Sequence, residues 1–214
     1  MKLFKLYALL GLVLLCAASP ARANWVTLEF PGAGRTLAGD IDSDNIVGYY
    51  DDAYGAHGFI YDGAAWTTLD APSAPATYIR GIKGEKIVGH YKDASGHMHG
   101  FVCDGTTWTT LDFPRAENTY AYGIDGDKIV GYYYDVSGDQ RGFLYDGTVW
   151  TTLDFPGARS TYASRINGDN IVGGYRAASG KGYGFVYTIP EPGSSIVLAL
   201  GGLWVILRRR AAQA

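Results

Sequence analysis

Three aspartates, Asp40, Asp42 and Asp44, are spaced like the first ligands of a calcium-binding loop. Carboxylates at alternate positions converge on one hard cation when such a loop folds around it. The stretch lacks the glycine and the distal glutamate of such a loop, and the sequence repeats described below place ordinary turn residues at these positions. We therefore expect turn chemistry here, with a single calcium site as the alternative.

Three histidines, His57, His97 and His99, carry the donor atoms of a transition-metal site. In other copies of the repeat, the positions of His57 and His99 are occupied by Arg141 and Tyr183, which are not usual substitutes for a histidine ligand. The sequence therefore predicts neither a metal site nor a cofactor.

Aromatic residues are abundant, with 17 Tyr and 5 Trp, and aromatic faces flanked by polar groups commonly hold sugars. Trp66, Trp108 and Trp150 recur with the repeat, which indicates packing. The tyrosines at the start of the first strand of each unit are less well explained by packing, and variable residues, among them Tyr122, follow them. This candidate binding surface comprises Tyr78, Tyr120, Tyr162, Arg80 and Arg165.

Catalysis needs convergent groups, such as two carboxylates at glycosidase separation or a nucleophile beside a base. Most acids here belong to repeated turns. Those that break the repeat are scattered through loops and strand ends, namely Glu29, Asp51, Asp52, Glu117 and Asp139. We expect no catalytic residues and a protein that is not an enzyme.

Residues 24–188 contain four copies of one sequence repeat. Tryptophans at 25, 66, 108 and 150 each open a Trp-x-Thr-Leu segment. Ile-Val-Gly recurs from residues 46, 87, 129 and 171, and Gly-Phe recurs at residues 58, 100, 142 and 184, with a period of 42. The copies are therefore in phase throughout.

Each unit divides into four short apolar or aromatic runs bounded by Gly and Asp, which predicts β-strands joined by hairpins. In the third full copy the runs are residues 119–124, 128–133, 142–145 and 150–155. The second run is apolar at consecutive positions, which indicates a sheet covered on both faces. Stacked or radially packed sheets provide such cover.

The ends of the repeat predict ring closure. The last copy lacks its fourth strand, whereas residues 25–30 form a fourth strand without a unit. A ring closed by this strand removes two exposed sheet edges, and about 42 residues is the size of a four-stranded propeller blade. We therefore predict an all-β, four-bladed β-propeller closed by the N-terminal strand, with a linear β-repeat stack as the alternative.

The units resemble the bacterial extracellular HAF repeats, in which Ile-Asn-x-x-Gly-x-Val-Gly is followed by His-Ala-Phe. The matching positions here are His57-Gly58-Phe59, His99-Gly100-Phe101, Arg141-Gly142-Phe143 and Tyr183-Gly184-Phe185, so the His-Ala pair is not kept. The resemblance implies an extracellular repeat and no established activity.

The first 23 residues are typical of a secretory signal peptide. Lys2 and Lys5 precede an apolar run, and Ala21 and Ala23 form the small-x-small pattern that signal peptidase cleaves. Lipid attachment at Cys16 is a weaker alternative, because large leucines precede that cysteine. Cleavage after Ala23 leaves Cys103 as the only cysteine, so the mature chain has no intrachain disulfide.

Residues 189–214 combine Pro190-Glu191-Pro192, an apolar run from 196 to 207 and the basic cluster Arg208, Arg209 and Arg210. Counted from residue 193, the run spans about 22 Å as a helix, which is shorter than a bilayer core. The tail resembles a PEP-CTERM sorting signal. This resemblance implies a short transmembrane sorting helix and processing by an exosortase, a membrane enzyme of Gram-negative bacteria that make exopolysaccharide; an ordinary tail anchor is the alternative.

Charge argues against one class of partner. Without the six basic residues of leader and tail, and without Glu191, the body keeps 12 basic and 20 acidic residues, a net charge of about −8. A nucleic-acid-binding surface is normally basic, so we expect no nucleic-acid partner. The same charge disfavours acidic polysaccharides unless cations bridge the two.

The sequence therefore predicts a secreted protein, held transiently in the inner membrane by its tail and then placed on the cell surface or in the extracellular matrix. Its body is expected to bind or scaffold matrix material or exopolysaccharide in a biofilm. Two alternatives remain, a propeller hydrolase or lyase acting on extracellular polysaccharide, and a structural coat protein without a small ligand.

Overall fold

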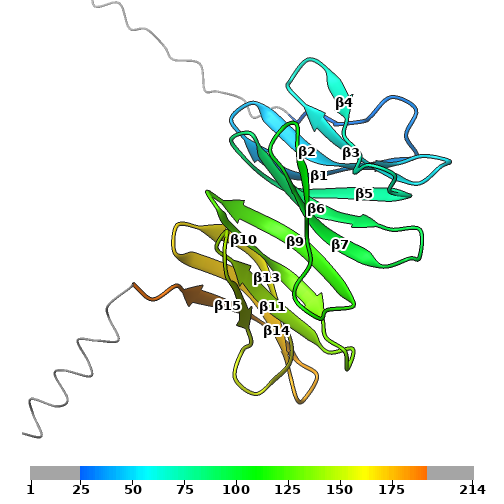
Figure 1. The fold of residues 1–214 in the computed structure, drawn as a ribbon. Helices are drawn as coiled ribbons and strands as arrows, with labels where there is room; N and C mark the ends of the chain where they lie inside the picture. The colour runs from blue at the N-terminus through cyan, green and yellow to red at the C-terminus, as the bar shows by residue number, and fades with distance from the viewer. Residues whose placement is uncertain (1–24, 192–214) are drawn as a thin grey trace, which may run out of the picture.

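The computed structural model describes residues 25–191, which form 15 β-strands in four antiparallel sheets (Figure 1). Sheet 1 contains β1 (Arg35–Asp42), β2 (Asn45–Asp51), β3 (Ala56–Tyr61) and β4 (Trp66–Thr68). Sheet 2 contains β5 (Ala76–Lys83), β6 (Lys86–Lys92), β7 (Met98–Cys103) and β8 (Trp108–Leu111). Sheet 3 contains β9 (Asn118–Asp125), β10 (Lys128–Tyr134), β11 (Gln140–Tyr145) and β12 (Trp150–Leu153). Sheet 4 contains β13 (Ala158–Asn167), β14 (Asn170–Ala177) and β15 (Gly182–Thr188).

Each sheet is one copy of the sequence repeat, and its strands pair in chain order. The all-β class and the division into four units are thus confirmed. Glycines at the predicted hairpins have positive φ, for example 94° at Gly147 and 61° at Gly126. Asp146 supports its turn by accepting hydrogen bonds from the amides of Thr148 and Val149. These Asp-Gly turns set the register of the flanking strands.

The glycine of Ile-Val-Gly allows an unusually close backbone approach inside each sheet. A Cβ atom at Gly131 would collide with the carbonyl oxygen of Tyr120 and lie 2.9 Å from the ring of Phe143, its cross-strand partner. Beside this contact the first strand bulges at Tyr122, because Ala121 pairs with Gly131 whereas Gly123 pairs with Val130. All four sheets repeat this arrangement, so each first strand projects one extra residue.

Consecutive sheets pack face to face. The first strand of each following sheet lies against the preceding sheet, and the valine of Ile-Val-Gly inserts into the next core cluster. Val47, Val88 and Val130 are fully buried in this way. Figure 1 shows the sheets following one another from β1–β4 at one end to β13–β15 at the other.

The row of sheets curves, so that its two ends approach each other at the inner strands. The guanidinium of Arg165 on β13 donates hydrogen bonds to the carbonyl oxygens of Tyr122 on β9 and of Gly39 on β1, at 3.3 Å and 2.6 Å. The first strands of sheets 1, 3 and 4 therefore meet around one side chain. This arrangement is propeller-like and differs from a straight stack.

The predicted closing strand is absent from the structure. Residues 25–30 form no strand, sheet 4 has three strands, and Trp25 is fully exposed. Phe30 is held by sheet 1, where its amide donates to Oγ1 of Thr36 at 2.9 Å and its ring stacks on Tyr50 at 3.7 Å. The equivalent Phe113 and Phe155 make the same contacts before sheets 3 and 4, but residues 25–30 do not pair with the outer edge of β15.

The last strand, β15, ends at Thr188. The predicted signal peptide (1–23) and the apolar and basic parts of the tail, including the predicted sorting helix, lie outside the described residues. Residues 25–191 contain no helix that is long and apolar enough to cross a membrane.

The close approach at Gly131 predicts that Gly131→Ala destabilises the protein by about 3 kcal/mol, because a methyl group there overpacks the sheet against backbone. The matched control is Gly34→Ala, where the nearest atom is the Asp51 oxygen at 3.7 Å. Thermal unfolding of both variants checks this. Equal melting temperatures would show that the glycine is not required by the close approach.

Candidate functional site

The five residues predicted to form a binding surface divide into three groups. Tyr78 and Tyr120 occupy equivalent positions on β5 and β9, and both belong to an aromatic cluster between sheets. Arg80, the bulged residue of β5, lies in the same cluster. Arg165 is engaged by backbone carbonyls, and Tyr162 lies apart on sheet 4.

We call this group the axial cluster, because it joins side chains of the inner two strands of sheets 1, 2 and 3. Its members are Tyr49, Tyr78, Arg80, His90, Tyr120, Tyr122 and Tyr132. The Arg80 guanidinium carbon lies 4.9 Å from the ring centroid of Tyr49, 5.2 Å from that of Tyr122 and 5.8 Å from that of Tyr78. One cation therefore faces aromatic rings from three repeat units.

The aromatic rings form a continuous series between the sheets. Tyr49 contacts Tyr78 edge-on at 5.0 Å, and Tyr78 stacks on His90 at 5.1 Å. His90 contacts Tyr120 at 4.9 Å, and Tyr120 stacks on Tyr132 at 4.6 Å. Burial raises the pKa of Tyr78, Tyr120 and Tyr132, so their phenols stay neutral.

His90 is the buried polar group of this cluster. Burial, and then the nearby charge of Arg80, lower the pKa of its imidazole to about 3, so the ring is neutral at physiological pH. The ring donates one hydrogen bond to the backbone of Ala121, which makes Nδ1 an acceptor. His90 Nδ1 and Arg80 Nε are buried without a hydrogen-bond partner.

Three of the seven members of the axial cluster were missed by sequence reasoning. Tyr49, His90 and Tyr132 directly follow Ile-Val-Gly, and they pair across the strands with Leu37, Tyr78 and Tyr120. That position was available as a signal, since it is aromatic or histidine in three of four copies. The fourth copy has Gly174, which ends the aromatic series.

Tyr162 faces a cavity on sheet 4 instead of joining the axial cluster. Its ring lies over Gly174, where a Cβ atom would come within 2.5 Å of the phenol oxygen. The cavity has a volume of about 410 Å³, and its lining includes Arg176, Tyr183 and Gln140. Tyr162 thus shares the sequence position of Tyr78 and Tyr120 but not their surroundings.

Asp40 and Asp42, considered above as calcium ligands, join two sheets. Asp40 accepts a hydrogen bond from the amide of Ile82 at 3.3 Å, and Asp42 accepts one from Gly84 at 2.7 Å. Asp125 binds the amide of Gly168 in the same way. Across residues 25–191, no group of three or more His, Cys, Asp or Glu side chains is placed to hold a metal ion.

His57 and His99 each lie between two aspartates. His57 Nδ1 is 2.7 Å from Asp70, and its Nε2 is 3.3 Å from Asp52. His99 repeats this with Asp112 and Asp93, at 2.9 Å and 3.3 Å. In sheet 3 the same place is taken by Arg141, whose guanidinium binds Asp154 at 2.5 Å and also lies near Asp135 and Asp139. We call these the peripheral pins, because they tie the β2–β3 type hairpin to the end of the fourth strand.

The acids considered for catalysis do not converge in the described chain. Asp51 pairs with Arg35, Asp52 with His57, and Asp139 with Arg141. The first two pairs belong to sheet 1 and the third to sheet 3, and each acid is engaged by a basic side chain of its own sheet. The structure thus brings together aromatic and cationic side chains, and it distributes the carboxylates over turns and pins.

The chain matches no family model and no curated protein. Solved structures that it resembles include a fungal lectin from Aleuria aurantia described as a six-bladed β-propeller with a novel fucose recognition mode, at 18% identity and a TM-score of 0.45 over 69% of this chain and 57% of the lectin. Another is the SapL1 lectin in complex with α-methyl fucoside, at 18% identity and a TM-score of 0.41 over 69% of this chain and 63% of the lectin. A third is AofleA from Arthrobotrys oligospora, at 16% identity and a TM-score of 0.44 over 67% of this chain and 50% of AofleA. The chain spans 50% to 63% of the length of these three proteins.

The peripheral pins predict a pH-dependent stability. The hydrogen bond to Asp70 raises the pKa of His57; at His99 partial burial opposes the rise, but the bonds to Asp112 and Asp93 outweigh it. Each imidazolium therefore stabilises the fold fully below the unfolded pKa of 6.5, and this contribution is lost as the pH rises through the higher folded pKa. The hydrogen bond from the amide of Tyr54 lowers the pKa of Asp52. The Asp52 carboxylate therefore stabilises the fold above its unfolded pKa of 3.8, and this contribution is lost as the pH falls through the lower folded pKa.

Melting temperatures should thus be highest between about pH 3.8 and 6.5 and fall at higher pH. The matched variant is His57→Arg with His99→Arg, which copies the pin of Arg141 and stays charged. Its melting temperature should fall less between pH 6 and pH 9, about the range in which histidine titrates. An identical decline in wild type and variant would contradict the role of the histidines.

Proposed function

We propose that the protein is an extracellular carbohydrate-binding scaffold and not an enzyme. The observation that carries this proposal is the axial cluster, where aromatic rings from three sheets surround Arg80. An enzyme of the hydrolase or lyase class would instead gather non-repeated acids at one place. The proposed fold at the finer level is a four-bladed propeller, whose fourth blade has three strands within residues 25–191.

The chemistry of the axial cluster suits a sugar. Aromatic rings pack against the C–H faces of a pyranose, and hydroxyl groups both donate and accept hydrogen bonds. Arg80 and the rings of Tyr78, Tyr120, Tyr122 and Tyr132 are half-buried, so part of their surface is open to a ligand, whereas the Arg80 Nε and His90 Nδ1 atoms are buried. The net charge of the body, about −8, favours a neutral exopolysaccharide over an acidic one.

Export and processing are the second part of the proposal. The leader directs secretion and is removed by signal peptidase, and the tail holds the chain in the inner membrane until an exosortase cleaves it. The end of the body supports this order. Ile189 donates the last backbone hydrogen bond, to Asp169 at 2.8 Å, and the following Pro190 and Glu191 are exposed. A protease therefore has access to the motif without unfolding β15.

Glycan binding is tested by immobilising neutral and acidic exopolysaccharides, with fucosides included because the similar lectins bind them. We expect Arg80→Gln and Tyr122→Leu each to weaken binding about tenfold, or about 1.4 kcal/mol, because both remove contacts of the axial cluster. Tyr162→Leu is the matched control, since it has the sequence position of Tyr78 and Tyr120 but lies outside the cluster. Unchanged melting temperatures exclude a folding defect.

Two outcomes would overturn the assignment of the sugar site. In one, the cluster variants bind like the wild type. In the other, Tyr162→Leu alone abolishes binding, which would move the site to the cavity of sheet 4. Binding to no glycan by the wild type would favour the coat-protein alternative.

Sorting is tested in the native host by deleting Pro190, Glu191 and Pro192. The deleted chain should stay in the membrane at its unprocessed size, because the exosortase has no motif to cleave. Replacing Glu29 by Gln in the body is a control that should be released normally. Normal release of the deleted chain would contradict the sorting proposal.

A further inference from the structure

The row of sheets begins with an uncovered surface. Ile82, Ile124 and Ile166 occupy one position of the first strand in sheets 2, 3 and 4, and each is 5–8% exposed because the preceding sheet covers it. Ile41 has this position in sheet 1 and is 61% exposed. We call the outer face of β1 the start surface.

The row also ends with an uncovered surface, on sheet 4. Val47, Val88 and Val130 are fully buried by the following sheet, whereas the equivalent Val172 is 41% exposed. A Cβ atom at Gly58 would come within 2.7 Å of Ile79 in the next sheet, but at Gly184 the nearest atom is 3.7 Å away and belongs to the same sheet. We call this face and the edge of β15 the end surface.

The edge of β15 carries an empty groove with the lining of a tryptophan site. In sheet 3, Trp150 packs at 5.1 Å from Phe143, 5.4 Å from Phe113 and 4.6 Å from Tyr145. The residues at the equivalent positions of sheet 4 are Phe185, Phe155 and Tyr187. They line a groove of about 370 Å³ that no tryptophan fills.

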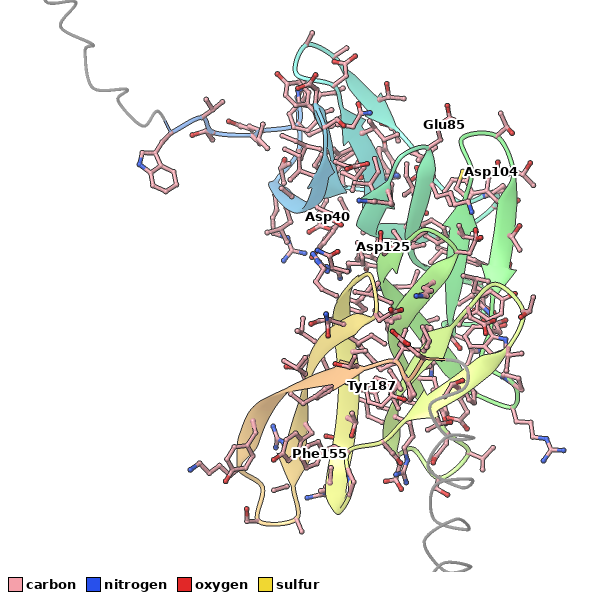
Figure 2. The ribbon with its side chains drawn as sticks, turned by 90° about the vertical axis from the view of Figure 1, so that its left-hand side faces the viewer. Asp40, Glu85, Asp104, Asp125, Phe155 and Tyr187 are labelled. Carbon is pink, nitrogen blue, oxygen red and sulfur yellow. The ribbon has the colours of Figure 1, made fainter. Side chains whose placement is uncertain are left out.

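One Trp-x-Thr-Leu segment of the described residues does not pack its tryptophan into a groove of this kind. Residues 25–28 have the Trp-x-Thr-Leu pattern of β4, β8 and β12, yet Trp25 is fully exposed. Figure 1 shows this segment beside sheet 1, and Figure 2 shows Tyr187 and Phe155 at the other end of the molecule. The groove and the segment that fits it are therefore separated within one copy.

We propose that residues 25–28 of a second copy of this chain add to β15 as its fourth strand. The internal sheets define the register: Trp66 pairs with Tyr61 and Trp150 with Tyr145, so Trp25 pairs with Tyr187 and Val26 with Val186. The strand places Trp25 in the groove. It also covers an edge on which Val186 is 69% exposed, and folded proteins rarely leave such edges open.

Addition of residues 25–28 to β15 also places sheet 1 of the second copy against sheet 4. Once residues 25–28 of the second copy pair with β15, its β1 follows in the position that β5, β9 and β13 have inside the chain. The start surface, with Ile41, then covers the end surface, with Val172 and Gly184. The junction thus reuses the interface that already joins consecutive sheets, and it also covers the cavity beside Tyr162.

Charge at the junction is complementary. Glu29 has the repeat position of Asp70, Asp112 and Asp154, the aspartates of the peripheral pins that follow the fourth strand. In the proposed junction, Glu29 of the second copy lies next to Tyr183. Lys181 lies over the Tyr183 ring with its ammonium 5.2 Å from the centroid. An acid of one copy therefore meets a base of the other, as in the internal pins.

This contact is head-to-tail, because the start surface of one copy meets the end surface of the next. Such heterologous contacts generate rings where the rotation closes and filaments where it does not. Within an extracellular matrix, either product presents several copies of the axial cluster on one assembly.

Cysteine crosslinking of the full chain tests the proposal. Val26→Cys and Val186→Cys are made as separate variants, mixed and oxidised, so that a dimer on a non-reducing gel reports contact between two copies. We expect about tenfold more dimer than from Val26→Cys mixed with Val149→Cys, because only directly opposed positions satisfy disulfide geometry. Adding Trp25→Ala to the Val26→Cys chain should reduce the dimer to the level of that control.

The double variant Val26→Cys with Val186→Cys separates contact between copies from closure within one copy. Crosslinked dimers and higher multimers support the proposal. A compact crosslinked monomer, without dimer from the mixed single variants, would overturn it in favour of ring closure by the same chain. Absence of any crosslink above the control level would also overturn it.

Discussion

The fold depends on one close approach, between the glycine of each Ile-Val-Gly and the carbonyl of the facing first strand. A side chain at Gly48, Gly89, Gly131 or Gly173 would collide with that carbonyl and with the phenylalanine ring of the third strand. The approach locks the first three strands of a sheet and coincides with the bulge in the first strand. Because bulges redirect side chains, the same constraint that builds the sheet aims Arg80 and Tyr122 toward the axis.

Repetition of this sheet makes the interfaces between sheets equivalent, and the axial cluster follows from that equivalence. The interface between sheets 1 and 2 places Tyr49 against Tyr78, and the interface between sheets 2 and 3 places His90 against Tyr120. Where the residue after Ile-Val-Gly is aromatic, its ring packs against a tyrosine ring, as Tyr132 does on Tyr120. In sheet 4 this residue is Gly174, and a cavity lies beside it. The two ends of the row are incomplete halves of this same interface, so the binding and the self-association that we propose both depend on one structural unit.

Polar interactions take the place of disulfides in holding the units together. The single cysteine of the body, Cys103, is a free buried thiol. Asp40, Asp42 and Asp125 bind backbone amides of the next sheet, and the peripheral pins hold the fourth strands. Asp40 and Asp42, which looked like ligands in the sequence, therefore stabilise the junction between sheets 1 and 2. Asp52 and Asp139, which were considered for catalysis, stabilise individual sheets.

The amino-acid sequence by itself determined the features that arise from local pattern. The strands, the Asp-Gly turns and the four units of about 42 residues were predictable, because hairpin chemistry and short apolar runs act over a few residues. Tyr78 and Tyr120, which share one repeat position, lie with Arg80 in the axial cluster, but whether these residues bind a ligand stays a prediction.

The tertiary structure decided what depends on the angle between sheets. That angle leaves the outer edge of β15 without a partner strand in the described residues and leaves Trp25 exposed, which no spacing along the chain reveals. It places the Arg165 guanidinium where it donates hydrogen bonds to the carbonyl oxygens of Tyr122 and Gly39. It also separates Tyr162 from Tyr78 and Tyr120, which have the same repeat position. A repeat is the same in every copy, but the neighbours of its first and last copies differ, and those neighbours are set only by packing in space.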